Sequence, residues 1–371
     1  MIKILFYIDE LSAGGAEKVL CNLVNNMDPS SFDITVHTTW KSDAKSLLKP
    51  HVKYKYVFSE RNKISRFIYR AETQLGLFYQ LHLKGDYDIE VAYLECGPTK
   101  VMASSTNKIA AHVAWIHCDL AKKFLDIDQF AKQTRNHYKK YDQVVCVSEA
   151  CKESYDQYFK DCVPSLVLHN VIDTEEIINK SKVNLNLDLK KKNLTFVAVG
   201  RQSYEKNYMM LLRVHKQLLD EGYKHSLWLI GEGSETVNLK KYVNDERLND
   251  SVSFFGFQSN PYPIMKEADV LVSSSIYEGF STVINEALIL GLPVITTDCS
   301  GMREILGDSE YGMITENNEN AFKDGMRKML SDHELRNDYK EKAIIRSAQL
   351  TGKAIAEMTE SFFESLVRRK H

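Results

Sequence analysis

The residues that point most directly to chemistry are two carboxylates, Glu278 and Glu286, with seven residues between them. The apolar run at 268–275 precedes them and is typical of a buried strand. The apolar residues of 283–290 recur at helical spacing. Glu278 is therefore expected in a loop at the carboxyl end of the strand, where open α/β sheets bind their ligands, and Glu286 inside the following helix.

The turn between the two carboxylates could hold a phosphate. Gly279 lets a ligand approach the backbone closely. The amides that follow, of Phe280, Ser281 and Thr282, would point outward at the start of the helix, where they attract anions and phosphate above all. A phosphate cradle flanked by two carboxylates that accept hydroxyl hydrogen bonds describes a nucleotide-sugar site. On spacing alone, an ordinary helix with Glu286 on a solvated face is the simpler interpretation.

The stretch from Glu278 to Val294 reads E-G-F-S-T-V-I-N-E-A-L-I-L-G-L-P-V and resembles the E-x7-E signature of retaining glycosyltransferases of family 4. The resemblance runs through most of the chain. It implies the GT-B fold of the α/β class, with two facing Rossmann-like domains, parallel sheets and an interdomain cleft, in a bacterial enzyme of capsule or exopolysaccharide assembly. Residues 1–170 would form the N-terminal acceptor-binding domain and 171–350 the C-terminal nucleotide-sugar-binding domain. Residues 351–371 would form a helix that packs back on the first domain.

Length and composition agree with a globular protein of two domains. The chain of 371 residues exceeds one ordinary domain, and its 44% hydrophobic and 26% charged residues are typical of soluble proteins. A formal net charge of −2 gives no overall basic character for binding nucleic acid. Seven scattered cysteines without C-x-x-C pairs favour reduced thiols in a cytoplasm. A strand at the N-terminus leaves no room for a signal peptide, and no apolar run reaches the length of a membrane span.

Two cations follow the apolar strand expected at 193–200. Arg201 and Lys206 straddle a strand-to-helix loop, and fixed cations there can neutralise a diphosphate, with bidentate geometry from the arginine. Surface charges in a loop are the alternative. The loop resembles the family's G-R-x(n)-K-[GN] element, which favours diphosphate binding. Arg201, Lys206 and the 279–282 amides would then stabilise the departing nucleoside diphosphate.

The first half of the chain supplies further candidates. Gly14 and Gly15 follow the strand expected at 2–8. The resemblance places them near the donor phosphates and the acceptor, whereas a tight strand-to-helix turn would need glycine equally. The absence of G-x-G-x-x-G weakens an NAD interpretation. His117 follows the strand expected at 110–116, and in the resembled family a histidine at this strand end hydrogen-bonds the donor sugar.

The resemblance also bears on the nucleobase and on the mechanism. The family binds the nucleobase with backbone near the end of the strand expected at 252–258, which points to Gly256 and Phe257. Retention of configuration could use Glu278 as a nucleophile, by the double-displacement logic of glycosidases. The resemblance implies instead that Glu278 binds sugar hydroxyls while the acceptor attacks from the face of the leaving group.

The segment 41–70 is basic and aromatic. It holds nine lysines and arginines, Lys45 among them, against two acidic residues, with five aromatic residues interleaved. A solvated helical face is the usual explanation of such a run. The alternative is an interfacial patch that contacts anionic lipid headgroups and a lipid-linked diphosphate acceptor. We therefore expect a cytoplasmic protein, with peripheral contact to the inner membrane surface through this segment.

Two D-x-D patterns, Asp86/Asp88 and Asp126/Asp128, match that of metal-dependent, single-domain glycosyltransferases. The pattern is short enough to arise by chance, and neither copy follows a convincing strand. The cations and helix amides described above leave a divalent ion without an obvious task. We expect no metal and no cofactor, the nucleotide sugar being a co-substrate.

We expect a retaining, nucleotide-sugar-dependent hexosyltransferase that moves a sugar to a lipid-linked or growing surface polysaccharide, with UDP as the expected nucleotide. One alternative is a non-catalytic GT-B protein that stabilises another transferase, which the intact candidate residues oppose. Another is an NAD-linked oxidoreductase, which the missing dinucleotide motif opposes. The sugar, the acceptor and the choice between UDP and GDP stay open.

Overall fold

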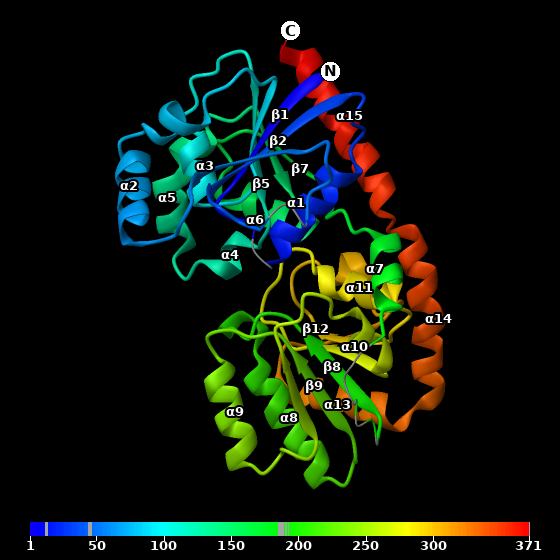
Figure 1. Cartoon of the computed structure of the whole chain (residues 1–371). Helices are drawn as coiled ribbons and strands as arrows, with labels where there is room; N and C mark the ends of the chain where they lie inside the picture. Colours follow the sequence, from blue (N-terminus) through cyan, green and yellow to red (C-terminus); the bar gives the residue numbers. More distant parts are fainter. Residues whose placement is uncertain (12–13, 44–46, 185–188, 190, 192, 371) are drawn as a thin grey trace. The chain divides into compact units, whose positions relative to one another are not determined.

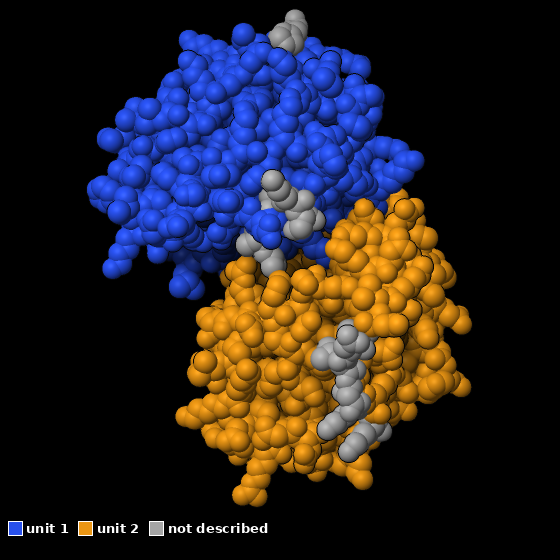
Figure 2. Space-filling view, viewed as in Figure 1, with its two compact units in different colours: residues 1–172, 352–371 blue, residues 173–351 orange. Residues whose placement is uncertain are grey.

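Strands and helices alternate along the chain in the computed structural model (Figure 1). The structure describes residues 1–11, 14–43, 47–184, 189, 191 and 193–370. Ser12 and Ala13 of the loop before Gly14, and Lys45 of the basic segment, lie outside the described residues. The chain forms two compact units, coloured separately in Figure 2: unit 1 comprises 1–172 with 352–371, and unit 2 comprises 173–351.

A parallel sheet forms the centre of unit 1, and its strands follow the order β3-β2-β1-β4-β5-β6-β7 within the described residues. Its strands are β1 (Ile2–Ile8), β2 (Phe32–Trp40), β3 (Lys53–Phe58), β4 (Ile89–Ala92), β5 (Ala111–Ile116), β6 (Gln143–Cys146) and β7 (Ser165–Val167). Ile4 of β1 pairs in register with Ile34 on one side and Ile89 on the other. The run from Ile4 to Ile8 is buried, as expected for the central strand of a sheet covered on both faces.

One helix of unit 1 comes from the far end of the chain. The helices of this unit are α1 (Gly15–Asn26), α2 (Lys63–Gln74), the π-helix η2 (Tyr79–Leu83), α3 (Gly97–Met102), α4 (Leu120–Lys123), α5 (Ile127–Tyr138), α6 (Glu149–Tyr158) and α15 (Gly352–Lys370). α15 packs on α1 and β5, and the buried ring of Phe363 lies edge-on to that of Phe6, with centroids 5.9 Å apart. The last helix therefore contributes to the core of the first unit.

Unit 2 is built on a second parallel sheet, whose described strands follow the order β10-β9-β8-β11-β12-β13. They are β8 (Thr195–Val199), β9 (Ser226–Ile230), β10 (Val252–Gly256), β11 (Val270–Ser273), β12 (Val294–Thr297) and β13 (Met313–Thr315). The chain enters at β8, runs outward through β9 to β10, and returns to β11 on the other side of β8. The strand order therefore reverses between β8 and β11.

Helices cover this second sheet with apolar side chains. They are α7 (Thr174–Ser181), the 3-10 turn η3 (Tyr204–Lys206), α8 (Tyr208–Asp220), α9 (Thr236–Asp245), α10 (Tyr262–Glu267), α11 (Thr282–Ile289), α12 (Met302–Leu306), α13 (Glu319–Ser331) and α14 (His333–Gln349). α8 packs on α9 and α13, and α11 packs on α7 and α14. The core includes Phe196 and Leu229 of the strands and Leu211 and Phe322 of the helices, all fully buried.

Three strands differ from the sequence interpretation. β3 runs through the basic segment, so a single helical face for 41–70 is wrong: the segment holds an edge strand followed by the start of α2. Exposed lysines at Lys53 and Lys55 suit an edge strand, because charge there opposes pairing with another chain. β7 and β13, three residues each, carry too little apolar sequence to be recognised. No helix in the described ranges is long and apolar enough to cross a membrane.

Two buried histidines form a hydrogen-bonded chain beneath the sheet of unit 2. Nδ1 of His215 lies 2.8 Å from Nε2 of His225, and Nε2 of His215 lies 2.9 Å from Oγ of Ser251. Nδ1 of His225 lies 2.8 Å from the Tyr223 carbonyl, which can only accept, so this nitrogen carries the proton and Nε2 accepts from His215. Both imidazoles are then neutral. Burial lowers the pKa of both histidines, and the neighbouring His225 lowers that of His215 further.

The buried His215–His225 pair predicts a loss of protein stability in mild acid. The unfolded histidines take up protons below about pH 6.5, whereas the folded pair excludes them, so stability falls as the pH drops. For each excluded proton, the free energy of unfolding falls by ~1.4 kcal/mol per pH unit. Urea unfolding of His225→Gln between pH 7.5 and 5.5 should show a shallower loss than wild type, and the exposed His333→Gln should match wild type. Equal slopes in all three proteins would contradict the role given to the pair.

Candidate active site

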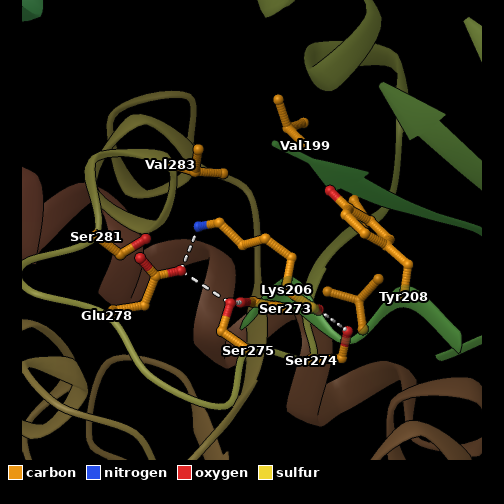
Figure 3. Close-up of a pocket in the computed structure, with 11 residues that line it drawn as sticks. Val199, Lys206, Tyr208, Ser273, Ser274, Ser275, Glu278, Ser281 and Val283 are labelled. Atoms are coloured by element: carbon orange, nitrogen blue, oxygen red, sulfur yellow. Dashed lines mark hydrogen bonds and ion pairs between the residues drawn. The ribbon is translucent and has the colours of Figure 1, made fainter. Parts of the chain in front are cut away.

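The loops after β8 and β11 meet where the strand order of unit 2 reverses. In open parallel sheets, ligands bind at such a point, beyond the carboxyl ends of the strands. Lys206 follows β8 and Glu278 follows β11, 72 residues apart in the chain, and the structure brings their side chains together. Figure 3 shows the ammonium of Lys206 directed at the carboxylate of Glu278.

The Lys206–Glu278 pair lines a small pocket. Nζ of Lys206 donates to Oε1 of Glu278, and Oγ of Ser275 donates to the same oxygen at 2.8 Å. The pocket wall includes Tyr208 and Ser281 as well (Figure 3). The two charged side chains remain 22% and 14% exposed, so a solvated ligand can reach both. A cation and a carboxylate are therefore available side by side to a ligand that carries phosphate and hydroxyl groups.

Backbone contacts fix the two loops against each other. Oγ of Ser274 donates to the Lys206 carbonyl at 2.8 Å, and the amide of Ile276 donates to the Glu205 carbonyl at 2.8 Å. From the next strand, Oγ1 of Thr297 donates to the Ser275 carbonyl at 2.6 Å. The positions of Lys206 and Glu278 are thus set before a ligand arrives, which lowers the cost of reorganisation on binding.

The turn at 279–282 leads into α11 as the sequence indicated. Ser281 is the N-cap, with extended backbone, and its side chain makes no capping hydrogen bond. Gly301, at φ +79°, packs on this turn: a Cβ there would lie 2.4 Å from the carbonyl oxygen of Gly279. The loop after β12 therefore supports the turn from behind, and it requires glycine at this position.

Glu286 lies in the interior of unit 2. Its side chain is only 3% exposed, so the solvated helical face that spacing alone favoured is wrong. The hydroxyl of Tyr262, at the start of α10, lies 3.4 Å from Oε1 of Glu286. A carboxylate is held inside a protein only where hydrogen bonds compensate its lost hydration. Glu286, in the second turn of α11, thus lies beside Tyr262 at the start of α10.

The other candidates of unit 2 lie along the same sheet edge. Arg201 is exposed directly after β8. Gly256 ends β10 at φ +64°, and Phe257 beyond it is 57% exposed. Gly231 joins these loops, because its amide donates to the Gly256 carbonyl at 2.7 Å and a Cβ on it would lie 2.1 Å from the Gly200 carbonyl oxygen. Its role was not anticipated, although the G-E-G sequence after β9 signals a close backbone approach.

Gln202 is a second residue that sequence reasoning missed. It lies between Arg201 and Lys206 in the sequence and is fully buried. Neither polar atom of its side chain has a hydrogen-bond partner within the described part of the chain. Its backbone amide donates to the Glu232 carbonyl at 3.1 Å, and its carbonyl accepts from the amide of Glu235 at 2.9 Å. A buried glutamine in a strand-to-helix loop gives no signal in a single sequence.

His117, Gly14 and Gly15 belong to unit 1, at the carboxyl edge of its sheet. Burial lowers the pKa of His117 to about 4, so its imidazole is neutral at pH 7. Gly14 is the N-cap of α1 with extended backbone, and a Cβ on Gly15 would meet no described atom within 4 Å. The extended backbone at Gly14 does not itself require glycine, but a Cβ there would lie 2.1 Å from Oε2 of Glu17, whose side chain would have to move. Among the described atoms, Gly15 leaves room for the approach of a ligand.

Comparison with known proteins identifies the second unit. Residues 180–346 match the family described as Glycosyl transferases group 1. This segment is therefore similar to the group 1 glycosyltransferases. The match includes all candidate residues of unit 2, and His117 and the Gly14–Gly15 pair lie outside it.

Relatives and solved structures extend the likeness beyond residues 180–346. One relative is a Campylobacter jejuni enzyme named N-acetylgalactosamine-N,N'-diacetylbacillosaminyl-diphospho-undecaprenol 4-alpha-N-acetylgalactosaminyltransferase. The two sequences are 34% identical over 57% of this chain, and the matched region spans 56% of that enzyme's length. The amylovoran biosynthesis glycosyltransferase AmsD of Erwinia amylovora is 24% identical over 94% of this chain and 95% of its own. Anabaena HepE, solved with UDP and glucose, superposes with a TM-score of 0.78 at 19% identity over 98% of this chain and all of its own. The protein has the GT-B architecture of two Rossmann-like units.

The aspartates that resembled metal motifs have other partners. Asp86 pairs with Lys3, and Asp88 accepts the amide of Lys3 at 2.8 Å. Asp126 caps α5 by accepting the amide of Gln129 at 2.9 Å. No group of three or more potential metal ligands occurs in the ranges that the structure describes. Three of these four aspartates therefore have structural contacts within unit 1.

Proposed function

We propose that the protein is a retaining glycosyltransferase that moves a sugar from a nucleotide diphosphate sugar, with UDP as the nucleotide, to a lipid-linked or growing polysaccharide acceptor. The observation that carries this proposal is the placement of Lys206 beside Glu278 at the reversal of strand order. The Lys206 ammonium can bind a diphosphate, and the Glu278 carboxylate can bind the hydroxyls of a sugar ring. The two side chains lie next to each other, as the diphosphate and the sugar do in a nucleotide-sugar donor.

The remaining candidates fit the two parts of that donor. Arg201 and the amides of the 279–282 turn join Lys206 around the diphosphate, where they offset the negative charge that develops as it leaves. Glu278 accepts hydrogen bonds from sugar hydroxyls. A neutral His117 contacts the donor sugar without bringing a second positive charge to the oxocarbenium-like transition state. The backbone near Gly256 and Phe257 takes the nucleobase.

Retention follows from attack on the face of the leaving group. Glu278 already accepts hydrogen bonds from Lys206 and Ser275. Such bonds stabilise the carboxylate and reduce its power as a nucleophile, which supports a binding role over a covalent one. Lys206, Arg201 and the helix amides supply the positive charge at the diphosphate, so we propose that the reaction needs no divalent cation.

The relatives support the substrate classes. The Campylobacter relative is named for a reaction on a sugar carried by diphospho-undecaprenol, a lipid-linked acceptor. AmsD is named for the biosynthesis of a polysaccharide, and Anabaena HepE was solved with UDP and glucose. A UDP-sugar donor and a lipid-linked glycan acceptor therefore suit this chain best.

Removing the ammonium of Lys206 tests the site. Lys206→Ala should lower the turnover of UDP-sugar hydrolysis or transfer by about 10²- to 10³-fold, since the leaving diphosphate loses a preorganised cation. Lys216→Ala, which removes an exposed ion pair with Asp220 on α8, is the matched control and should retain turnover. EDTA should leave wild-type turnover unchanged, and NMR of the product should show the donor's anomeric configuration. Near-normal turnover of Lys206→Ala would remove Lys206 from the site.

The outer face of α2 supports peripheral contact with an anionic membrane. Ile64 and Phe67 are 71% and 73% exposed, and Lys63, Arg66 and Arg70 are exposed on the same helix. Exposed apolar and basic residues on one helix are typical of binding at a lipid interface. No acidic residue occurs in its first turn. We propose that this face binds anionic lipid headgroups and brings the protein to a lipid-linked acceptor.

Charge reversal tests the membrane contact. Lys63→Glu/Arg66→Glu/Arg70→Glu should weaken co-sedimentation with phosphatidylglycerol vesicles by roughly 10²-fold or more, at ~1 kcal/mol for each basic residue lost near the surface. A matched control reverses three exposed lysines of unit 2, Lys240, Lys241 and Lys266. It should sediment like wild type. Equal binding by both triple variants would exclude α2 as the contact.

A further inference from the structure

A buried carboxylate lies directly beneath the turn that carries His117. Glu95, beyond the end of β4, is only 3% exposed and accepts three hydrogen bonds. Its Oε1 accepts from Nζ of Lys123 at 2.5 Å and from Sγ of Cys118 at 3.3 Å, and its Oε2 accepts from the backbone amide of His117 at 3.1 Å. One carboxylate therefore holds the first two residues after β5 and ties them to the end of α4.

The Lys123 ammonium keeps this carboxylate charged. Burial, the largest single effect, would raise the pKa of Glu95, but the charge and hydrogen bond of Lys123, with smaller contributions from the ring and the backbone amide of His117, lower it. Removing one partner of such a pair leaves an uncompensated buried charge, which is far costlier than removing both. Lys123 lies at the end of α4, whose N-cap Asp119 accepts the amide of Lys122, so a capped turn of helix brings the ammonium to the carboxylate.

The imidazole of His117 packs against a neighbouring ring, but its Nε2 makes no hydrogen bond to a described residue. Its ring lies against that of Tyr93, with centroids 4.7 Å apart. Nε2 is buried and has no hydrogen-bond partner anywhere in residues that the structure describes. A buried polar atom without a partner costs free energy, so its retention indicates that a ligand group completes it. The backbone of the turn, in contrast, is fully anchored through Glu95.

The two charges act on the imidazole in opposite directions. Burial lowers the pKa of His117 most; Glu95 raises it, and Lys123 lowers it again. Burial outweighs the nearby carboxylate, so the imidazole stays neutral and can either donate to or accept from a hydroxyl.

We propose that Glu95 and Lys123 are positioning residues for His117: the carboxylate fixes the turn that carries the imidazole, and the ammonium of Lys123 holds that carboxylate in its charged, hydrogen-bond-accepting form. This inference rests on the proposed function for the contact between His117 and the donor sugar. The anchoring itself rests on the hydrogen bonds around Glu95 alone.

The test compares Lys123→Met with Lys122→Met, which removes the adjacent and more exposed lysine of the same helix. NMR of protein labelled at the glutamate side-chain carboxyl carbons follows the titration of Glu95, assigned from the spectrum of Glu95→Gln. Lys123→Met should raise the pKa of Glu95, because the ammonium no longer offsets burial, and transfer turnover should fall as the turn loses its charged acceptor. Lys122→Met should leave both as in wild type. An unchanged titration in folded Lys123→Met, or equal changes in both variants, would overturn the proposal.

A double variant tests the proposal even if Lys123→Met fails to fold. Glu95→Gln/Lys123→Met removes both charges together, so no buried charge is left uncompensated, while transfer turnover should fall about tenfold through the loosened turn. Wild-type turnover in this double variant would overturn the proposal. An absence of transfer by the wild-type protein would count against the proposed function, and the titrations would still decide whether Lys123 keeps Glu95 charged.

Discussion

The contact between Lys206 and Glu278 is the interaction on which the proposed site depends. The two partly buried charges are each other's partner, and each comes from a loop that the parallel sheet brings to the same point. The order of strands in unit 2 places β8 beside β11, and that adjacency converts two residues 72 positions apart into neighbours. A donor that binds there replaces an internal ion pair by contacts to its own phosphates and hydroxyls.

Close backbone packing keeps this pair in place. Gly301 and Gly231 both adopt positive φ and leave no room for a side chain against the neighbouring loop. In unit 1, the Glu95 carboxylate likewise fixes a loop, because it accepts hydrogen bonds from the turn after β5. The two units therefore share one arrangement: rigid sheets end in loops that are fixed by a few short contacts, with polar groups left available at the edge.

The sequence predicted the fold through strong local signals. The buried strands that border the site, and α11 with its N-cap Ser281, lie close to their expected positions, because long apolar runs and helix caps act locally. The E-x7-E resemblance pointed to Glu278 and Glu286. Burial of Glu286 and pairing of Glu278 with Lys206 depend on tertiary packing, which spacing cannot report. Gln202 and Glu95 carried no local signal, because a single buried polar residue looks like any loop residue in a sequence.

Calorimetric titration with UDP in the presence of EDTA tests most directly whether the Lys206–Glu278 site binds the diphosphate of a nucleotide. UDP should bind without added metal, and UMP, which lacks the second phosphate, should bind at least about tenfold more weakly because it loses a charge-assisted contact. Equal affinities for UDP and UMP, or binding of NADH alone, would contradict the claim. UDP binding that disappears with EDTA would show that a metal, and not the lysine, neutralises the diphosphate.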